Sequence, residues 1–334
     1  MTMIRALAIG LACVVASGPG LAQHAFAQGA SDAKSYPNRT VRVIVPFPPG
    51  GPADVIARFV GQKLSEDWGQ TVVVENRPGG NTTIAAQHVA RSTPDGYTLL
   101  IPMDTTMVLN PLTIPNLPYE PLKDLIPISM LTKNMSMVVT RIAGPKSIKD
   151  LIAQAKARPG KMNMGAGTIT SRLGAVLFAK TAGIDVQLIP FKGSAEIGQA
   201  VLAGTVDFAL DSTGTALPLV QGGQYRALAK YTNQPLPMFP GVPSLSEAAG
   251  LPSIDESSTW IAVAAPAGTP RPIVDKIQNA IAKIYADRAT MQKLEKVGIN
   301  AVNSTSDELV AFIRKESMRW SQVLKENRHL LKLQ

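Results

Sequence analysis

The chain has 334 residues, 45% hydrophobic and 17% charged, which excludes an intrinsically disordered protein and allows two domains of ordinary size. Its formal net charge is +9, but the basic residues are scattered, with no basic run, aromatic stacking platform or zinc-ligand cluster. We therefore expect no nucleic-acid partner and interpret the charge as a solvated surface with a mild preference for anions.

The first 27 residues have the pattern of a secretory signal peptide, with Arg5 before the apolar run Ala6 to Val15 and a cleavage site at Ala25-Phe26-Ala27. The run is shorter than the ~20 residues that span a bilayer, which disfavours a membrane anchor. Cys13, the only cysteine, lies inside this segment and lacks a lipoprotein context. We expect an exported mature chain that begins near Ala27 and contains no cysteine.

The stretch Thr40 to Lys63 is the best-defined unit: a short β-branched strand, a turn rich in proline and glycine, and the start of a helix. Gly50 and Gly51 leave backbone amides unshielded, and Pro52 suits the first helical position. The open start of a helix carries free N–H groups and a partial positive charge, so it is a ready anion site. The alternative is a plain strand-to-helix crossover whose turn merely needs glycine.

The same alternation of strand and helix continues along the chain. Further strands are expected at 71–75, 97–101, 135–140, 162–164, 186–189, 206–210, 225–229 and 260–265. Helices are expected to end near Arg91, Lys156, Ala182, Gly204, Gln221, Ala286, Val297 and the C-terminus, whereas 111–127, dense in proline, is expected to be irregular. This order predicts an α/β protein with a mainly parallel, helix-flanked sheet in each of two domains.

Three strand ends lead into small, polar turns that open helices: Phe47 to Asp54, Gly79 to Thr83 and Gly165 to Ser171. In open α/β sheets, ligands bind beyond the carboxyl ends of the strands. If the three turns meet at one cleft, they grip an anion through helix N-termini and hydroxyls. This arrangement predicts binding without chemistry.

Motifs for enzyme chemistry are scarce. Outside the signal segment only two histidines remain, His88 and His329, and there is no G-x-S-x-G, G-K-[ST] or H-E-x-x-H motif. Gly165-Ala166-Gly167 begins like a dinucleotide fingerprint, but Thr170 stands in place of the third glycine. We expect no cofactor and no metal, while hydrolysis by paired carboxylates stays open.

Several loop motifs in this order give the chain a family resemblance. They are Tyr36-Pro37-Asn38-Arg39, Pro46 to Gly51 with Asp54, Glu75 to Gly79, Pro94 to Leu100, Asn116 to Tyr119, Pro190 to Gly193, Arg226 to Ala229 and Ala265 to Pro270. The chain resembles the Bug family, the TctC-like periplasmic receptors of tripartite tricarboxylate transporters. The resemblance implies a periplasmic binding protein with a ligand cleft between two lobes, lobe one from 36–134 with 260–334 and lobe two from 135–259.

The resemblance also implies a set of ligand-binding residues. By motif position these are Phe47, Gly51 and Asp54, then Thr82 and Thr83, then Gly167, Thr168 and Asp211. Pro48, Gly50, Asn81, Thr105, Arg172 and Ser212 complete the predicted set.

Six of these residues have alternatives or depart from the family pattern. Asp54 is either a ligand contact or a residue favoured by the helix dipole, and Asp211 either accepts a hydrogen bond from the ligand or fixes its own turn. Asn81-Thr82-Thr83 replaces a Gly-Gly-Asn-like run. Arg172 replaces a histidine and either binds a distal carboxylate through two hydrogen bonds or points out from a surface helix.

The expected function is capture of a small organic carboxylate, a dicarboxylate or an aromatic acid, for the membrane components of such a transporter. We expect a monomer in the periplasm. One alternative is a ligand sensor that feeds a two-component kinase, and a less favoured one is an exported hydrolase.

Overall fold

A computed structural model describes residues 35–233, 235–251 and 259–327. The predicted signal peptide, its cleavage position and His329 lie outside these residues. Within them, no helix combines the length and the apolar character that crossing a membrane requires.

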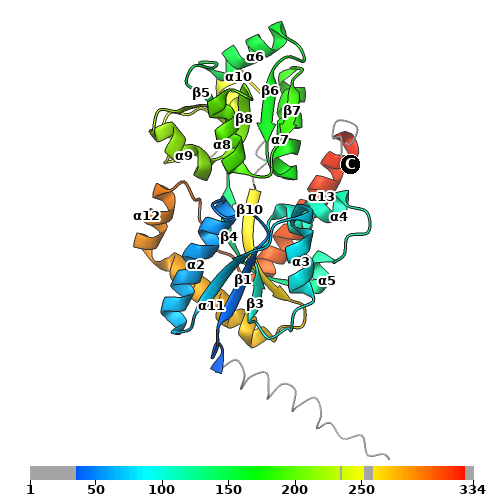
Figure 1. Cartoon of the computed structure of the whole chain (residues 1–334), viewed down its shortest axis with the longest axis vertical. Coiled ribbons are helices and arrows are strands. Elements are labelled where there is room, and N and C mark those ends of the chain that lie inside the picture. The colour runs from blue at the N-terminus through cyan, green and yellow to red at the C-terminus, as the bar shows by residue number, and fades with distance from the viewer. Residues whose placement is uncertain (1–34, 234, 252–258, 328–334) are drawn as a thin grey trace, which may run out of the picture.

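Two five-stranded sheets form the framework (Figure 1). The first has the order β2-β1-β3-β10-β4, with β1 at Val41–Val45, β2 at Val72–Asn76, β3 at Thr98–Leu100, β4 at Leu125–Asn134 and β10 at Thr259–Pro266. The second has the order β7-β6-β8-β5-β9, with β5 at Ser136–Arg141, β6 at Asn163–Ala166, β7 at Gln187–Pro190, β8 at Phe208–Ser212 and β9 at Tyr225–Lys230. We call each sheet with its helices a lobe.

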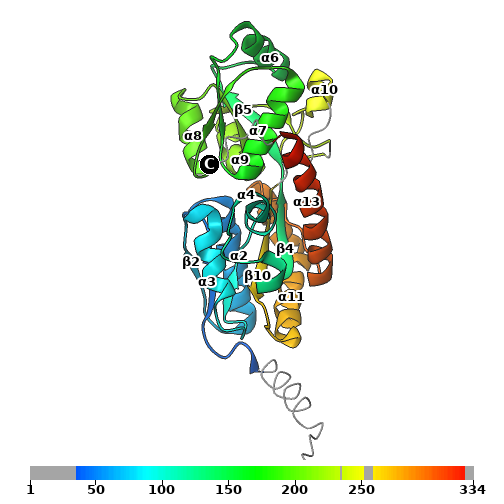
Figure 2. The ribbon, with the colours of Figure 1, turned by 90° about the vertical axis from the view of Figure 1, so that its right-hand side faces the viewer.

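Each sheet is parallel except for one strand, which confirms the predicted α/β class. β10 runs antiparallel to β3 and β4, and β5 runs antiparallel to β8 and β9. Both antiparallel strands lie where the chain crosses between the lobes. β4 leads through Met135 into β5, and β10 returns alongside β4. The proposed lobe boundaries, at 134/135 and 259/260, therefore lie at the ends of a two-stranded ribbon, visible at the centre of Figures 1 and 2.

Helices flank both sheets. The first lobe has α2 at Pro52–Trp68, α3 at Thr83–Ala90, α11 at Arg271–Ala286, α12 at Arg288–Lys296 and α13 at Ser306–Asn327. The second has α6 at Ile148–Ala157, α7 at Ile169–Ala182, α8 at Ser194–Ala203, α9 at Thr213–Gln221 and α10 at Leu245–Ala249. The short elements are η1 at Gly80–Thr82, η2 at Thr105–Leu109, α4 at Asn110–Thr113 and α5 at Pro121–Asp124.

The segment 111–127 is more regular than expected. Pro111 and Pro121 lie in the first turns of α4 and α5, where the missing N–H of proline breaks no helical hydrogen bond. Leu125 then begins β4. The prolines start elements here instead of preventing them.

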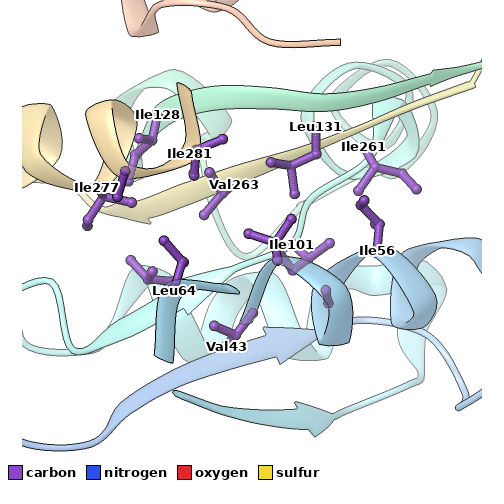
Figure 3. Packing of buried hydrophobic residues seen from close by; sticks show 14 of the residues in the cluster. Val43, Ile56, Leu64, Ile101, Ile128, Leu131, Ile261, Val263, Ile277 and Ile281 are labelled. Atoms are coloured by element: carbon purple, nitrogen blue, oxygen red, sulfur yellow. The ribbon is translucent and has the colours of Figure 1, made fainter. Parts of the chain in front are cut away.

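Apolar side chains fill both faces of the first sheet. On one face α2 and α11 pack against β1, β4 and β10 through residues such as Ile56, Ile277 and Val263 (Figure 3). On the other face a second cluster joins Trp260 of β10 and Trp320 of α13 to Leu173 of α7. Since α7 belongs to the second lobe, this cluster holds the two lobes together.

Candidate functional site

A cavity of about 130 Å³ lies between the lobes. From the first lobe it is lined by Phe47, Pro48, Pro49, Gly51, Pro52, Ala53 and Met103, a mainly apolar wall. From the second lobe it is lined by Gly167, Thr168, Ser171, Lys192, Gly193, Ser194, Ala195, Glu196, Ile197, Leu210, Asp211 and Ser212. Ser136 and Thr259, at the two crossings between the lobes, complete the lining.

Four helices begin at this cavity. The N-cap residues of α2, α7, α8 and α9 are Gly51, Thr168, Gly193 and Ser212, and all four line it. The topology explains why α7, α8 and α9 converge, because the preceding strands β6, β7 and β8 are parallel neighbours whose carboxyl ends meet at one edge of the sheet. The first-turn N–H groups of each helix have no partner within the helix. The cavity therefore favours a negatively charged ligand.

The Phe47 to Asp54 turn reaches the cavity, but Asp54 does not line it. Asp54 is buried behind the turn, where Oδ2 accepts a hydrogen bond from the Gly50 N–H (3.0 Å) and Oδ1 accepts one from Asn76 (2.9 Å). Its carboxylate also pairs with Arg58 (2.9 Å). Burial acts to raise the pKa of Asp54, but these hydrogen bonds and the Arg58 charge outweigh it and lower the pKa overall. Asp54 thus fixes the turn. Gly50 does not line this cavity but, together with Gly214, lines a neighbouring hollow.

The Gly79 to Thr83 turn does not line the cavity. Asn110 Nδ2 donates to the Asn81 carbonyl (2.7 Å) and to Thr82 Oγ1 (3.1 Å), which holds both residues in the left-handed region at φ +51° and +76°. The Thr83 hydroxyl donates to the Gly80 carbonyl (2.7 Å). Thr105 is buried nearby, and its hydroxyl has no hydrogen-bond partner among the described residues. These four predicted residues lie together, but away from the lining of this cavity.

The predicted second-lobe residues come together in the lining, except for Arg172. Thr168 Oγ1 caps α7 by accepting from the Ser171 N–H (3.2 Å), and Gly167 packs so that an added Cβ would lie 3.3 Å from Ile197. Arg172 is half-buried outside the lining, and burial lowers its pKa.

Asp211 fixes its own turn and also lies in the cavity lining, while a hydrogen bond from the ligand stays a prediction. Its Oδ1 fixes the start of α9 by accepting from the Ser212 N–H (2.8 Å) and the Thr215 hydroxyl (2.6 Å). Its Oδ2 is buried at the cavity and has no hydrogen-bond partner in the described part of the chain. Burial raises the pKa of Asp211 to about 6, against the opposing effect of these hydrogen bonds.

Lys192, Ser194 and Glu196 line the cavity but are missing from the predicted set. They follow β7, where a strand end leads through Gly193 into a helix, the same pattern that marked the other turns. The Lys192 ammonium is exposed and forms no ion pair within the described residues. Applying the turn pattern to 190–196 would have found all three.

Comparison with known proteins places this architecture in a family. The model of the tripartite tricarboxylate transporter family receptor (TctC) matches residues 56–329. Protein BugT of Bordetella pertussis is 35% identical over 307 residues, which cover 90% of this chain and 93% of BugT.

Two solved structures of Rhodopseudomonas palustris proteins carry a ligand in their descriptions. Rpa4515 with adipate is 31% identical, with a TM-score of 0.83 over 87% of this chain and 97% of that one. MatC with bound malate is 29% identical, with a TM-score of 0.79 over 86% of this chain and all of that one. With its two lobes, its anion-directed cavity and these matches along most of its length, the chain belongs to the tripartite tricarboxylate transporter receptor family.

Proposed function

We propose that this protein is a periplasmic receptor that captures a small organic carboxylate and delivers it to the membrane components of a tripartite tricarboxylate transporter. The observation that carries the proposal is the convergence of four helix N-termini on one small cavity between the lobes. The signal-peptide pattern and the family support the periplasmic location.

The lining supports a dicarboxylate or an aromatic acid as the ligand. Phe47, Pro48 and Met103 offer an apolar wall to a hydrocarbon chain or a ring. The helix ends supply N–H groups for one carboxylate, and the Lys192 ammonium is available to a second one. The adipate and malate named for the two relatives are both dicarboxylates.

Reversible capture without catalysis fits the residues at the cavity. The serines that line it have no histidine beside them, since His88, the one histidine among the described residues, lies on α3 outside the lining. Closure of the lobes removes water from the anion, which strengthens its interactions with the fixed backbone dipoles. Opening then releases an unchanged ligand.

The proposal is tested by unfolding and refolding the purified protein to strip bound ligand, then titrating a panel of mono-, di- and tricarboxylates and aromatic acids. At least one acid should stabilise the protein by about 2.7 kcal/mol at a hundredfold excess over its Kd. The matching neutral amides serve as controls and should have little effect. An entire panel without stabilisation would contradict carboxylate capture, and product formation would indicate a hydrolase.

Delivery is tested separately by deleting the gene and measuring uptake of the labelled acid. Uptake should fall when the gene is deleted and return when the gene is restored. Unchanged uptake, with the transporter expressed independently, would contradict delivery and favour the sensor alternative.

A further inference from the structure

A buried polar contact joins the two lobes directly behind the cavity. The Thr170 hydroxyl of α7 donates a hydrogen bond to Oδ2 of Asp104, and both residues are fully buried. Asp104 follows Met103, and Thr170 lies between Thr168 and Ser171; these three neighbours all line the cavity. The contact therefore connects the first-lobe wall of the cavity to the Gly167 to Ser171 turn of the second lobe.

The surroundings of Asp104 disfavour its ionised form. Its Oδ1 has no hydrogen-bond partner, and no cation pairs with it, among the described residues. Burial raises the pKa of Asp104 to about 8, and the nearby backbone N–H groups of Thr105 and Trp260 oppose this shift only in part.

The charged groups that face Asp104 come from α13. The Glu316 carboxylate adds to the rise in the pKa of Asp104 through its negative charge. Glu316 itself pairs with Arg319 and accepts a hydrogen bond from the Trp320 indole, so its charge is held in place. Arg172 is on the same helix as Thr170 but forms no ion pair with Asp104.

Separation of the lobes would break the Thr170 contact and admit water to the Asp104 carboxyl group. A hydrated aspartate has a pKa of about 3.9, so the open form loses its proton at neutral pH. The buried form keeps the proton, because an anion without a cation partner is costly inside a protein. The two forms thus differ by one bound proton.

We propose that Asp104 is a proton-dependent positioning residue for ligand capture: as a neutral acid it binds Thr170 and holds the Gly167 to Ser171 turn over the ligand, so that closure takes up a proton. The direction of the pH dependence follows from the proton that closure takes up. Well between the pKa of the open form and that of the closed form, each unit of pH rise disfavours closure roughly tenfold, and the dependence is complete by about pH 9.

Asp211, which lines the cavity, is a second carboxyl group with a raised pKa, at about 6. Its effect has the same sign but is complete by about pH 7. The interval between pH ~7 and ~8 therefore isolates the Asp104 contribution, and Asp211→Asn provides the control.

The test needs no ligand. Fluorescent dyes attached through Asn279→Cys on α11 and Lys149→Cys on α6 report the distance between lobes in single molecules, and the mature chain is expected to lack other cysteines. The ratio of closed to open molecules should fall roughly fivefold from pH ~7 to pH ~8, because the closed-form pKa of Asp104 lies at the upper end of this interval. In Asp104→Asn, which keeps an oxygen that accepts from Thr170, it should not change over this interval. Thr170→Val should lower the closed fraction at both pH values, and Thr170→Ser should restore it.

A pH-independent closed fraction in the wild-type protein would overturn the proposal. So would an Asp104→Asn variant that keeps the wild-type pH dependence. Because no carboxylate is added, failure of this test leaves the receptor function standing, and failure of the carboxylate panel leaves this test valid.

Discussion

Lys192 lines the cavity, and in our proposal its charge binds the second carboxylate of a dicarboxylate ligand. Lys192→Ala should weaken a dicarboxylate roughly fivefold, because an exposed ion pair contributes up to ~1 kcal/mol, and should change the affinity for its monocarboxylate analogue much less. Lys149→Ala on α6, away from the lining, is the matched control. Titration calorimetry measures both acids. An equal loss for both would place Lys192 outside the recognition of a second carboxylate.

The side chain of Asp54 is expected to contribute to the stability of the fold, and not directly to ligand binding. Since its folded-state pKa is lowered, its contribution is complete above the unfolded pKa of ~3.9 and is lost as the pH falls through the lower folded value. Asp54→Asn should therefore reduce the free energy of unfolding by about 2 kcal/mol at pH ~7. Urea unfolding should show this difference shrinking below pH ~4. Asp275→Asn, in an exposed pair with Arg271, should cost far less; equal losses would deny Asp54 its structural role.

Among the secondary-structure elements, the helices that begin at the cavity are the ones expected to affect ligand binding. Thr168 and Ser147 cap α7 and α6 in the same way, each accepting a hydrogen bond from the N–H three residues on. Thr168→Ala and Ser147→Ala should each lower the free energy of unfolding by about 1 kcal/mol. Only Thr168→Ala should also weaken carboxylate binding in a titration, because α7 begins at the cavity and α6 does not. Similar affinities for the two variants would contradict a ligand role for this helix start.

The alternation of strands and helices was predictable from local patterns, because β-branched runs, glycine stops and capping residues act within a few positions. The place of the Gly79 to Thr83 turn was not. The Asn110 side chain holds Asn81 and Thr82 from 28 or 29 residues away, and no local pattern encodes such a contact.

For the whole molecule, the approach of the lobes depends on a glycine. An added Cβ on Gly298, which has φ +77°, would lie 2.8 Å from Gly214 Cα and 2.9 Å from the Thr213 carbonyl oxygen of the other lobe. Gly250, at φ +66°, has nothing within 4 Å of such an atom. Gly298→Ala and Gly250→Ala should therefore lose a similar ~1 kcal/mol of stability from backbone strain.

Only Gly298→Ala should also lower ligand affinity, because its methyl group collides with the second lobe in the closed form. Thermal unfolding and carboxylate titration of both variants separate these effects. Undiminished affinity in Gly298→Ala would mean that closure does not need this close approach.

The two-lobed plan followed from the family resemblance, whereas the contacts between lobes did not follow from any pattern. Asp104 and Thr170 are 66 residues apart, and neither stands in a motif that predicts the other. Arg172 shows the same limit, since a helical position close to a binding turn does not determine which way a long side chain turns.

The central place of β10 also has a consequence for synthesis. β10 lies between β3 and β4, yet it begins at Thr259, after all strands of the second sheet. Because the chain is made from its N-terminus, the first sheet stays divided until this late strand is available, whereas the second sheet has all its strands by Lys230. The inserted lobe is therefore expected to fold before the lobe that contains β1.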